Sequence, residues 1–594
     1  MTADPIAFRA VATLLDPQRG LQDVSIAGRE EAVLAICTAN KIPLLSLPDW
    51  GKGYTALVGH PAFCRAREAE AEQWRAQRRE YLPLHEALSS AGVANVLIKS
   101  VGIPPSLPYR SDNLDLLVDV EDGPTARQIL FDLGYVELIN VEEPQKFLFR
   151  KFHLGESISA VHLHQFVGWG TEFLAAADVL RSAQPSADDP AVFLPGPENA
   201  LLITMAHAFY EDKAIKLGDL WKAIHLLRTA DLDWEGMYRL VEARGWRAGL
   251  DTCILLWARL EEGLYGDHSF PPGVVKEAEA HAPVWCREYV RARLAEREGA
   301  GRPYFSFPWP VSFFFSKRHY YAKVLCDSAL RPRQKMADIF RHSWAGVKRR
   351  LPLPFQRGML VTLSGIDGSG KTTQAELLRR AFRVCDIRTR YVWSRAGSSR
   401  FTDGVIRLVR RLTLGGALPK GEGLDLDSDT RAAKVARKRF WLRHPLWRAG
   451  WVALVGLDLL PRYWVCVGWP LLRRQVVIGD RYVYDAMVEL AALADAPGFL
   501  ESRAARWFLR LCPRPGAAYL LHLDPERAAT RDPQEVVAFL KQQVCLYRQG
   551  AAKWGLRVID ADRDLADVAD ELVRDGLRAY YRGWARPTSA QQGR

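Results

Sequence analysis

Residues 365–372 read Gly-Ile-Asp-Gly-Ser-Gly-Lys-Thr and fulfil the pattern G-x-x-x-x-G-K-[ST]. Glycines in this pattern let backbone N–H groups curl around phosphate oxygens, the lysine can reach the β- and γ-phosphates, and the threonine hydroxyl can ligate Mg²⁺. The flanking sequence predicts an apolar strand at 359–363 (MLVTL) and an amphipathic helix at 373–382 (TQAELLRRAF). The stretch therefore predicts a strand, a phosphate-binding loop and a helix, in that order.

Three further apolar runs predict more strands of the same sheet, at 476–480 (VVIGD), 518–524 (AYLLHLD) and 557–561 (RVIDA). The first ends in Asp480, which is where a sheet of this kind places a metal-associated carboxylate, and Arg481 follows where a cation can face an acceptor phosphate. We expect an α/β fold, with a C-terminal parallel sheet flanked by helices.

The whole chain of 594 residues is too long for one core and predicts two to four domains. Its net charge of +12 favours anionic ligands such as nucleotides, phosphosugars, nucleic acid or an anionic membrane. The nine cysteines form no C-x-x-C pair, which argues against a zinc ribbon or a disulfide framework, and the first ten residues do not resemble a signal peptide. We expect a cytoplasmic protein.

Composition and periodicity divide the chain into three blocks. Residues 1–270 alternate helical and strand-like patterns, residues 271–354 are rich in proline, aromatic residues and arginine, and residues 355–594 contain the βα pattern headed by the glycine-rich loop. We expect an N-terminal domain of mixed helices and strands and a C-terminal α/β domain, joined by a packed connector.

The last block resembles a known family. Its motifs GIDGSGKTTQ, IGDRY and LHLDPERAATR have the order and spacing of the thymidylate kinase family of P-loop kinases. They are still more similar to a thymidylate-kinase-like branch with the motif D-R-Y-x-x-D, which is Asp480 to Asp485 in this chain. The resemblance covers residues 355–594 and implies phosphoryl transfer from ATP with Mg²⁺.

The resemblance also implies a role for each matched residue. The donor phosphates and Mg²⁺ would be held by Gly365, Gly368, Ser369, Gly370, Lys371, Thr372 and Thr373. Asp367 would face the sugar hydroxyl of the acceptor or the metal, Asp480 would organise Mg²⁺, and Arg481 would bind the acceptor phosphate. Three further arginines would either contact phosphate groups or remain solvated on the surface: Arg395, Arg527 and Arg531.

The acceptor half departs from the family. Residues 394–397 (SRAG) stand where thymidylate kinases carry T-R-E-P-G, and residues 483–487 (VYDAM) replace those that address the base. ATP is therefore implied as donor, while the acceptor stays open between a nucleoside monophosphate and another phosphorylated small molecule, including a phosphosugar.

The first block carries a second set of motifs. Residues 94–100 (ANVLIKS) predict a strand and turn, residues 110–119 (RSDNLDLLVD) an acidic cluster that opens a strand, and residues 205–221 two helices around a short loop. This order resembles an uncharacterised nucleotidyltransferase family, which implies an α+β domain that places carboxylates on divalent metal ions.

The match is incomplete at the metal site. The metal carboxylates of that family correspond to Asn113 or Asp112, to Asp115, and to His162 within the strand VHLH. We predict Asp115 as a catalytic and metal-binding residue, and keep open whether the domain is active or is degenerate and binds nucleotide, packs or regulates. His162 and His164 share one face of a strand and suggest a metal pair without a visible third ligand.

Two segments of the C-terminal block have compositions that raise the question of membrane contact. Residues 451–472 are apolar but interrupted by Asp458, Pro461 and Arg462, which favours a buried or interfacial helix pair over a membrane span. Residues 431–448 interleave cations with tryptophans and suit either a solvated helix face or an anionic surface.

These observations give three alternatives: an ATP- and Mg²⁺-dependent small-molecule kinase, a nucleotidyltransferase that modifies a sugar or protein, and a regulatory module switched by ATP. We expect a homo-oligomer with a nucleotide or phosphosugar acceptor and peripheral membrane contact. No motif for reading nucleic acid is present in the sequence.

Overall fold

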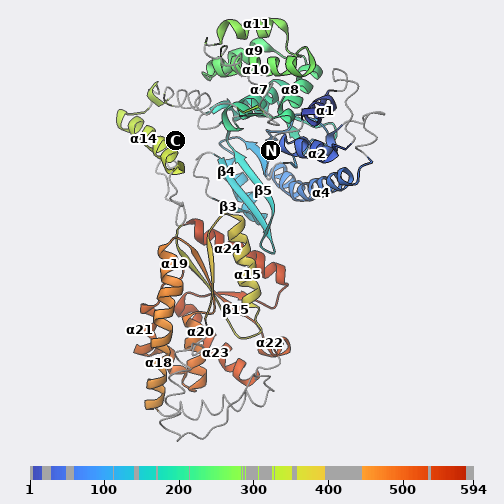
Figure 1. The fold of residues 1–594 in the computed structure, drawn as a ribbon. Helices are drawn as coiled ribbons and strands as arrows, with labels where there is room; N and C mark the ends of the chain where they lie inside the picture. The colour runs from blue at the N-terminus through green and yellow to red at the C-terminus, as the bar shows by residue number, and fades with distance from the viewer. Residues whose placement is uncertain are drawn as a thin grey trace. The chain divides into compact units, whose positions relative to one another are not determined.

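The computed structural model divides the chain into two compact units (Figure 1). The N-terminal unit comprises residues 1–150 and 158–352, and the C-terminal unit comprises 151–157 and 353–594. The structure describes residues 5–16, 28–47, 59–110, 113–138, 146–168, 172–212, 214–282, 330–350, 357–394, 445–532 and 537–582, together with isolated positions between 284 and 328.

The N-terminal unit contains a mixed five-stranded sheet in the order β1-β2-β5-β4-β3. Its strands are β1 (Asn95–Leu97), β2 (Leu114–Val118), β3 (Val136–Leu138), β4 (Lys146–His153) and β5 (Glu156–His164). The central pair β2 and β5 is parallel, whereas β1 pairs with β2 and β3 with β4 in antiparallel fashion. The long helix α4 (Pro61–Ser90) and α5 (Gly123–Asp132) contact each other, and their apolar residues share a buried core with the strands.

A second buried cluster holds the helical part of this unit together. Its helices are α1 (Pro5–Leu15), α2 (Glu30–Ala39), α7 (Pro197–Ala206), α8 (Leu217–Thr229), α9 (Trp234–Ala243), α10 (Arg247–Tyr265) and α11 (Pro272–His281). A π-helical stretch, His207–Asp212, continues α7. The shorter elements are η1 (Leu44–Ser46), α6 (Ala176–Arg181) and the strand pairs β6 (Phe166–Gly168) with β7 (Glu172–Ala175), β8 (Gln184–Pro185) with β9 (Phe193–Leu194), and β10 (Ala214–Ile215) with β11 (Phe305–Ser306).

Half of the expected connector, residues 271–354, lies outside the described residues, so its packing stays a prediction. Two of its helices are described, α11 and α14 (Pro332–Arg350).

The C-terminal unit is built on a parallel five-stranded sheet in the order β13-β14-β12-β15-β16. Its strands are β12 (Met359–Ser364), β13 (Thr389–Trp393), β14 (Val476–Asp480), β15 (Ala517–His522) and β16 (Arg557–Asp560). Helices α15 (Lys371–Val384) and α24 (Leu565–Arg582) pack side by side, and α15 contacts three of the strands. The other helices are η6 (Pro497–Glu501), α20 (Val483–Leu493), α21 (Arg503–Leu511), α22 (Pro525–Arg531) and α23 (Val537–Trp554). The expected α/β architecture with a parallel sheet is therefore confirmed.

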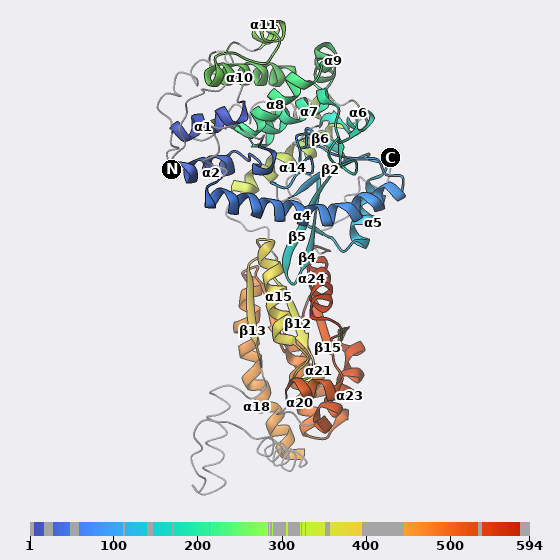
Figure 2. The same ribbon diagram turned by 90° about the vertical axis from the view of Figure 1, so that its right-hand side faces the viewer.

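The apolar segment 451–472 does not form the expected helix pair. Helix α18 (Pro445–Tyr463) runs without a break through the π-helical η5 (Trp464–Gly468) into α19 (Trp469–Leu472) (Figure 2). Pro461 lies in the last turn of α18, and a π-helical turn follows it directly. By length and composition, residues 448–472 form the one described helix that is able to cross a membrane.

Candidate functional site

The glycine-rich loop joins the C-terminal end of β12 to the first turn of α15 in the C-terminal unit. Gly365 and Gly368 have φ angles of 149° and 82°, which L-residues with a side chain rarely adopt. A Cβ atom at either glycine would lie 2.6 Å from a backbone oxygen, that of Leu521 or that of Ala528. The backbone of this loop therefore requires glycine at both positions.

Asp485 holds the first residues of this loop in place through hydrogen bonds. It is buried on α20 and accepts hydrogen bonds from Ser364 Oγ at 2.7 Å, from the Gly365 N–H at 3.2 Å and from the Tyr547 hydroxyl at 2.7 Å. It also caps its own helix by accepting from the Tyr482 N–H at 2.8 Å. The last acid of the D-R-Y-x-x-D motif is thus a positioning residue for the loop.

Asp480 ends β14 directly beside the loop. Parallel pairing places it opposite Leu363 of β12, and it is 1% exposed. Its Oδ2 accepts hydrogen bonds from Thr372 Oγ1 at 2.6 Å and from the Tyr391 hydroxyl at 2.8 Å. Its Oδ1 is buried without a hydrogen-bond partner among the described residues. A buried carboxylate oxygen left open beside a hydroxyl is a hard-oxygen donor set, which fits Mg²⁺.

Three charged side chains meet on the other side of the loop. Lys371 Nζ donates to the backbone oxygen of Ile366 at 2.7 Å and lies 3.7 Å from Asp367 Oδ1, which also pairs with the Arg481 guanidinium. Burial, followed by the charge of Arg481, lowers the pKa of Lys371. Arg481 adopts a left-handed φ of 71°, which is uncommon for a side-chain-bearing residue and typical of functional sites.

The remaining predicted residues of this site differ in where they lie. Gly370 has a φ of 85°, Ser369 is buried with an Oγ that has no described partner, and Thr373 is exposed in the first turn of α15. Arg527 pairs with Asp562, and Arg531 ends α22 without a hydrogen bond or ion pair to the described loop residues. Arg395 lies outside the described residues. No contact tests these roles, which stay predictions.

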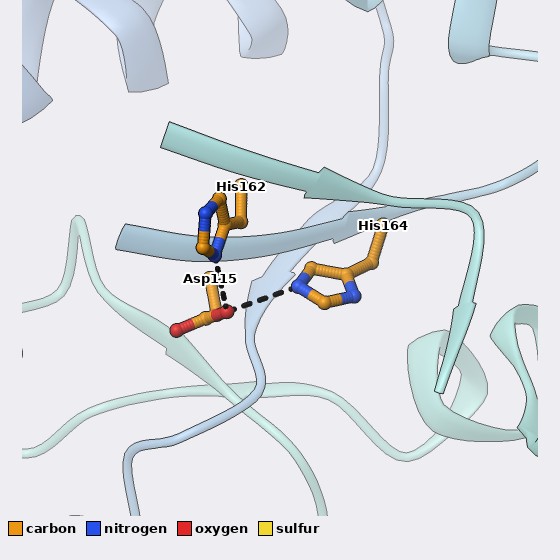
Figure 3. Close-up of side chains that lie close together, drawn as sticks. All are labelled: Asp115, His162 and His164. Atoms are coloured by element: carbon orange, nitrogen blue, oxygen red, sulfur yellow. Dashed lines mark hydrogen bonds and ion pairs between the residues drawn. The ribbon is translucent and has the colours of Figure 1, made fainter. Parts of the chain in front are cut away.

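In the N-terminal unit, Asp115 of β2 contacts two histidines of β5, His162 and His164 (Figure 3). Parallel pairing sets Asp115 opposite His162, and His164 shares the face of His162 because it is two residues further on. Asp115 Oδ1 is 3.3 Å from His162 Nδ1 and 3.0 Å from His164 Nε2. The three ligand atoms lie within 4.8 Å of one another and can hold a metal ion. The third ligand that the sequence did not reveal is therefore Asp115.

The other oxygen of Asp115 faces a lysine. Lys99 Nζ is 3.2 Å from Asp115 Oδ2 and 3.4 Å from Glu211 Oε2. Burial alone would raise the pKa of Asp115, but Lys99 and the two histidines hold it well below its ordinary value. Burial lowers the pKa of His164 to about 4, so its imidazole is neutral near pH 7.

This cluster lacks some of the carboxylates that a two-metal nucleotidyltransferase site requires. Asp112 lies outside the described residues, and Asn113 occupies the bend just before β2. The described cluster thus offers one carboxylate and two imidazoles, a set that suits Zn²⁺ or another transition metal better than Mg²⁺.

A pocket lined by cations opens beside Lys99. Its lining includes the cations Lys41, Lys99, Arg110 and Lys222, together with one acid, Asp219. Lys222 Nζ donates to the backbone oxygen of Lys99 at 3.0 Å, and burial lowers the pKa of Lys222. A pocket of this charge suits a phosphate-bearing ligand.

Comparison with known proteins agrees with this part of the chain. Residues 58–261 match the model of a family described as an uncharacterised nucleotidyltransferase. The chain contains a nucleotidyltransferase-family domain. The match encloses β1 to β9 with Asp115, His162 and His164, and it does not extend to the glycine-rich loop. No curated protein matches the chain.

Sequence patterns did not reveal several of the partners that shape these sites. Tyr391 and Tyr547 bond to Asp480 and Asp485 from positions that carry no motif. Lys99 belongs to the strand and turn predicted at residues 94–100, which offers a signal for its place beside Asp115. Glu211 lies on a π-helical stretch that no pattern of apolar residues predicts.

Proposed function

We propose that the C-terminal unit catalyses phosphoryl transfer from ATP to a phosphorylated small molecule. The observation that carries the proposal is the hydrogen bond from Thr372 to Asp480 Oδ2. The other carboxylate oxygen of Asp480, Oδ1, is buried and has no hydrogen-bond partner among the described residues, so it is available to a metal ion. Family comparison supports the nucleotidyltransferase-family domain and not this activity, so the proposal rests on the geometry of the loop and its neighbours.

The proposed mechanism uses alignment and charge neutralisation. Backbone N–H groups of the loop and of the first turn of α15 would bind the donor phosphates, and Lys371 would exchange the Ile366 oxygen for a phosphate oxygen. Thr372 and Asp480 would hold Mg²⁺, which when bound neutralises charge on the β- and γ-phosphates. Arg481, held by Asp367, would bind the acceptor phosphate.

The proposal is tested with purified full-length chain, γ-labelled ATP and a panel of nucleoside monophosphates and phosphosugars. We expect label to reach one acceptor class, and Lys371→Ala to lower the rate by roughly a hundred- to a thousandfold, the cost of removing one donor to developing charge. Transfer to no acceptor, from protein shown to be folded by circular dichroism, would reject the kinase.

A second candidate function is nucleotidyl transfer by the N-terminal unit. The family match at residues 58–261 favours it, and the cationic pocket beside Asp115 supports it, since a nucleoside triphosphate carries the complementary charge. The cluster has one carboxylate and two histidines where two-metal nucleotidyltransferases have three carboxylates. This difference favours a transition metal at the site, or a domain that binds a nucleotide without catalysing its transfer.

This second candidate is tested with α-labelled ATP and the other nucleoside triphosphates, each with Mg²⁺, Mn²⁺ or Zn²⁺. Covalent label that is lost in Asp115→Asn and kept in Lys371→Ala would assign the transfer to the N-terminal unit. Label that follows Lys371 instead would assign it to the C-terminal unit.

A further inference from the structure

An exposed apolar strip runs along the helix formed by α18, η5 and α19. Its members are Leu457, Trp464, Val465, Trp469 and Leu472. Leu457 and Trp464 are seven residues apart, Val465 and Trp469 four, and Trp469 and Leu472 three, which are spacings that bring side chains to one side of a helix. They are far from buried, with Trp464 exposed by 55%, Trp469 by 54% and Leu472 by 74%. At a rise of about 1.5 Å per residue, the strip is roughly 20 Å long.

Helix α21 widens this strip. Trp507 and Leu511 lie four residues apart and are exposed by 61% and 46%. Trp464 Nε1 donates to the backbone oxygen of Leu511 at 3.0 Å, and a Cβ at Gly456 would lie 3.8 Å from the Phe508 ring. The two helices therefore contribute to one surface, which we call the tryptophan face.

The opposite side of the long helix is part of the protein core. Val455, Leu459, Tyr463 and Val467 follow one another at intervals of four residues and are each at most 1% exposed. Asp458 is buried as well. Because one face is committed to the core of the C-terminal unit, this helix is not free to cross a bilayer although its composition would allow it.

The two segments that form the tryptophan face carry almost only positive charge. Residues 445–474 and 503–514 contain a single acid, the buried Asp458. They contain eight arginines, of which six are exposed: Arg473, Arg474, Arg503, Arg506, Arg510 and Arg514. The Arg473 guanidinium lies 4.9 Å from the centre of the Trp469 ring, so charge and aromatic surface are interleaved.

We propose that the tryptophan face binds the surface of an anionic lipid membrane. Tryptophan rings prefer the interface between headgroups and acyl chains, and arginines beside them gain energy from the negative surface potential. Aliphatic side chains between them add buried apolar area, as in helices that lie in the plane of a membrane. This proposal is independent of the phosphoryl-transfer and nucleotidyl-transfer functions.

The test is co-sedimentation of the full-length chain with vesicles of phosphatidylcholine alone and of an equal mixture of phosphatidylcholine and phosphatidylglycerol. We expect binding to the mixed vesicles, weakened by salt, and little binding to phosphatidylcholine. Trp469→Ser and Trp507→Ser should each weaken binding roughly tenfold, since each removes the burial of a large ring. Phe340→Ser, which removes an aromatic ring exposed by 66% in the N-terminal unit, is the matched control and should bind as the unmodified chain does.

A second pair of variants separates charge from fold. Arg473→Glu and Arg506→Glu change exposed side chains, so circular dichroism and thermal unfolding should stay unchanged while binding to the mixed vesicles falls. Equal binding to both vesicle types, or binding indifferent to the tryptophan variants, would overturn the proposal. So would a dimer in analytical ultracentrifugation that Trp469→Ser dissociates, because the face would then join two copies of the chain.

Discussion

Thr372 and Asp480 are 108 positions apart in the sequence, and the Thr372 hydroxyl donates to Asp480 Oδ2 at 2.6 Å. The contact links the first turn of α15 to the end of β14, across the carboxyl edge of a parallel sheet. Ligands bind at this edge in open α/β sheets, where neighbouring connections leave in opposite directions. In this sheet the connections diverge at β12, because β14 pairs on one side of it and β15 on the other.

The role of the Thr372 hydroxyl is open to a direct test. Thr372→Val keeps the shape of the side chain and removes the oxygen that would ligate Mg²⁺, so we expect transfer to fall at least tenfold and the Mg²⁺ concentration for half-maximal rate to rise. Thr372→Ser keeps the oxygen and should retain most activity. Equal rates for the valine and serine variants, measured over a Mg²⁺ titration, would argue against a metal at Thr372 and Asp480.

Tyr547 is predicted to support ATP binding indirectly. Its hydroxyl bonds to Asp485, which in turn holds Ser364 and Gly365 at the start of the loop. Tyr547→Phe should lower the free energy of unfolding by about 1 kcal/mol and weaken ATP binding several-fold, with a smaller change in kcat.

A matched control for this variant is Tyr519→Phe. The Tyr519 hydroxyl donates to Asp575 at 2.9 Å, away from the loop. It should cost similar stability and leave ATP binding unchanged in calorimetry. If both variants weaken ATP binding equally, Asp485 does not position the loop.

The sequence was most informative where local patterns suffice. Apolar runs predicted β12, β14, β15 and β16, and the glycine spacing predicted the turn between β12 and α15, because these features depend on neighbours in the chain. The contacts of Asp480 with Tyr391 and of Asp485 with Tyr547 depend on sheet order and helix packing, which no local pattern contains.

The dependence on contacts between distant residues also explains the two largest differences between the sequence-based predictions and the structure. His162 and His164 carry a visible period of two, but their shared partner Asp115 depends on β2 and β5 being parallel neighbours. Asp458, Pro461 and Arg462 were expected to divide the segment 451–472 into a helix pair, and the π turn that follows Pro461 has no sequence signature.

Asp251 should make the N-terminal unit more stable in mild acid. The side chain is fully buried and paired with Arg247 Nε at 3.0 Å, yet burial raises its pKa to about 6. A raised carboxyl pKa means that the folded state binds the proton more tightly than the unfolded state, so stability rises as pH falls from about 6 towards about 4.

Because one pKa unit corresponds to about 1.4 kcal/mol, the gain can reach about 3 kcal/mol relative to Asp251→Asn, which cannot titrate. Hydrogen exchange of α10 amides in both proteins, from about pH 7 to about pH 4, measures the difference. Parallel pH profiles for the two proteins would contradict the prediction.

The Asp115 cluster should prefer a metal that accepts imidazole in tetrahedral geometry. For bonds of about 2.0–2.1 Å, adjacent ligands of a tetrahedral ion lie about 3.3 Å apart. The separations of Asp115 Oδ1 from His162 Nδ1 and His164 Nε2 are 3.3 and 3.0 Å, so little movement is needed to admit an ion.

We expect the full-length chain to bind Co²⁺ as a spectroscopic substitute for Zn²⁺, with visible absorption bands typical of tetrahedral coordination. His164→Ala should abolish the bands, whereas Thr372→Val should keep them because the C-terminal site offers only oxygen ligands. His85→Ala is the matched control, since His85 lies in the same unit and stacks on Tyr81 and Phe193 rather than facing Asp115. Bands that survive in His164→Ala would place the ion elsewhere. Absence of any band in metal-free protein reloaded with Co²⁺ would show that Lys99 alone satisfies the charge of Asp115.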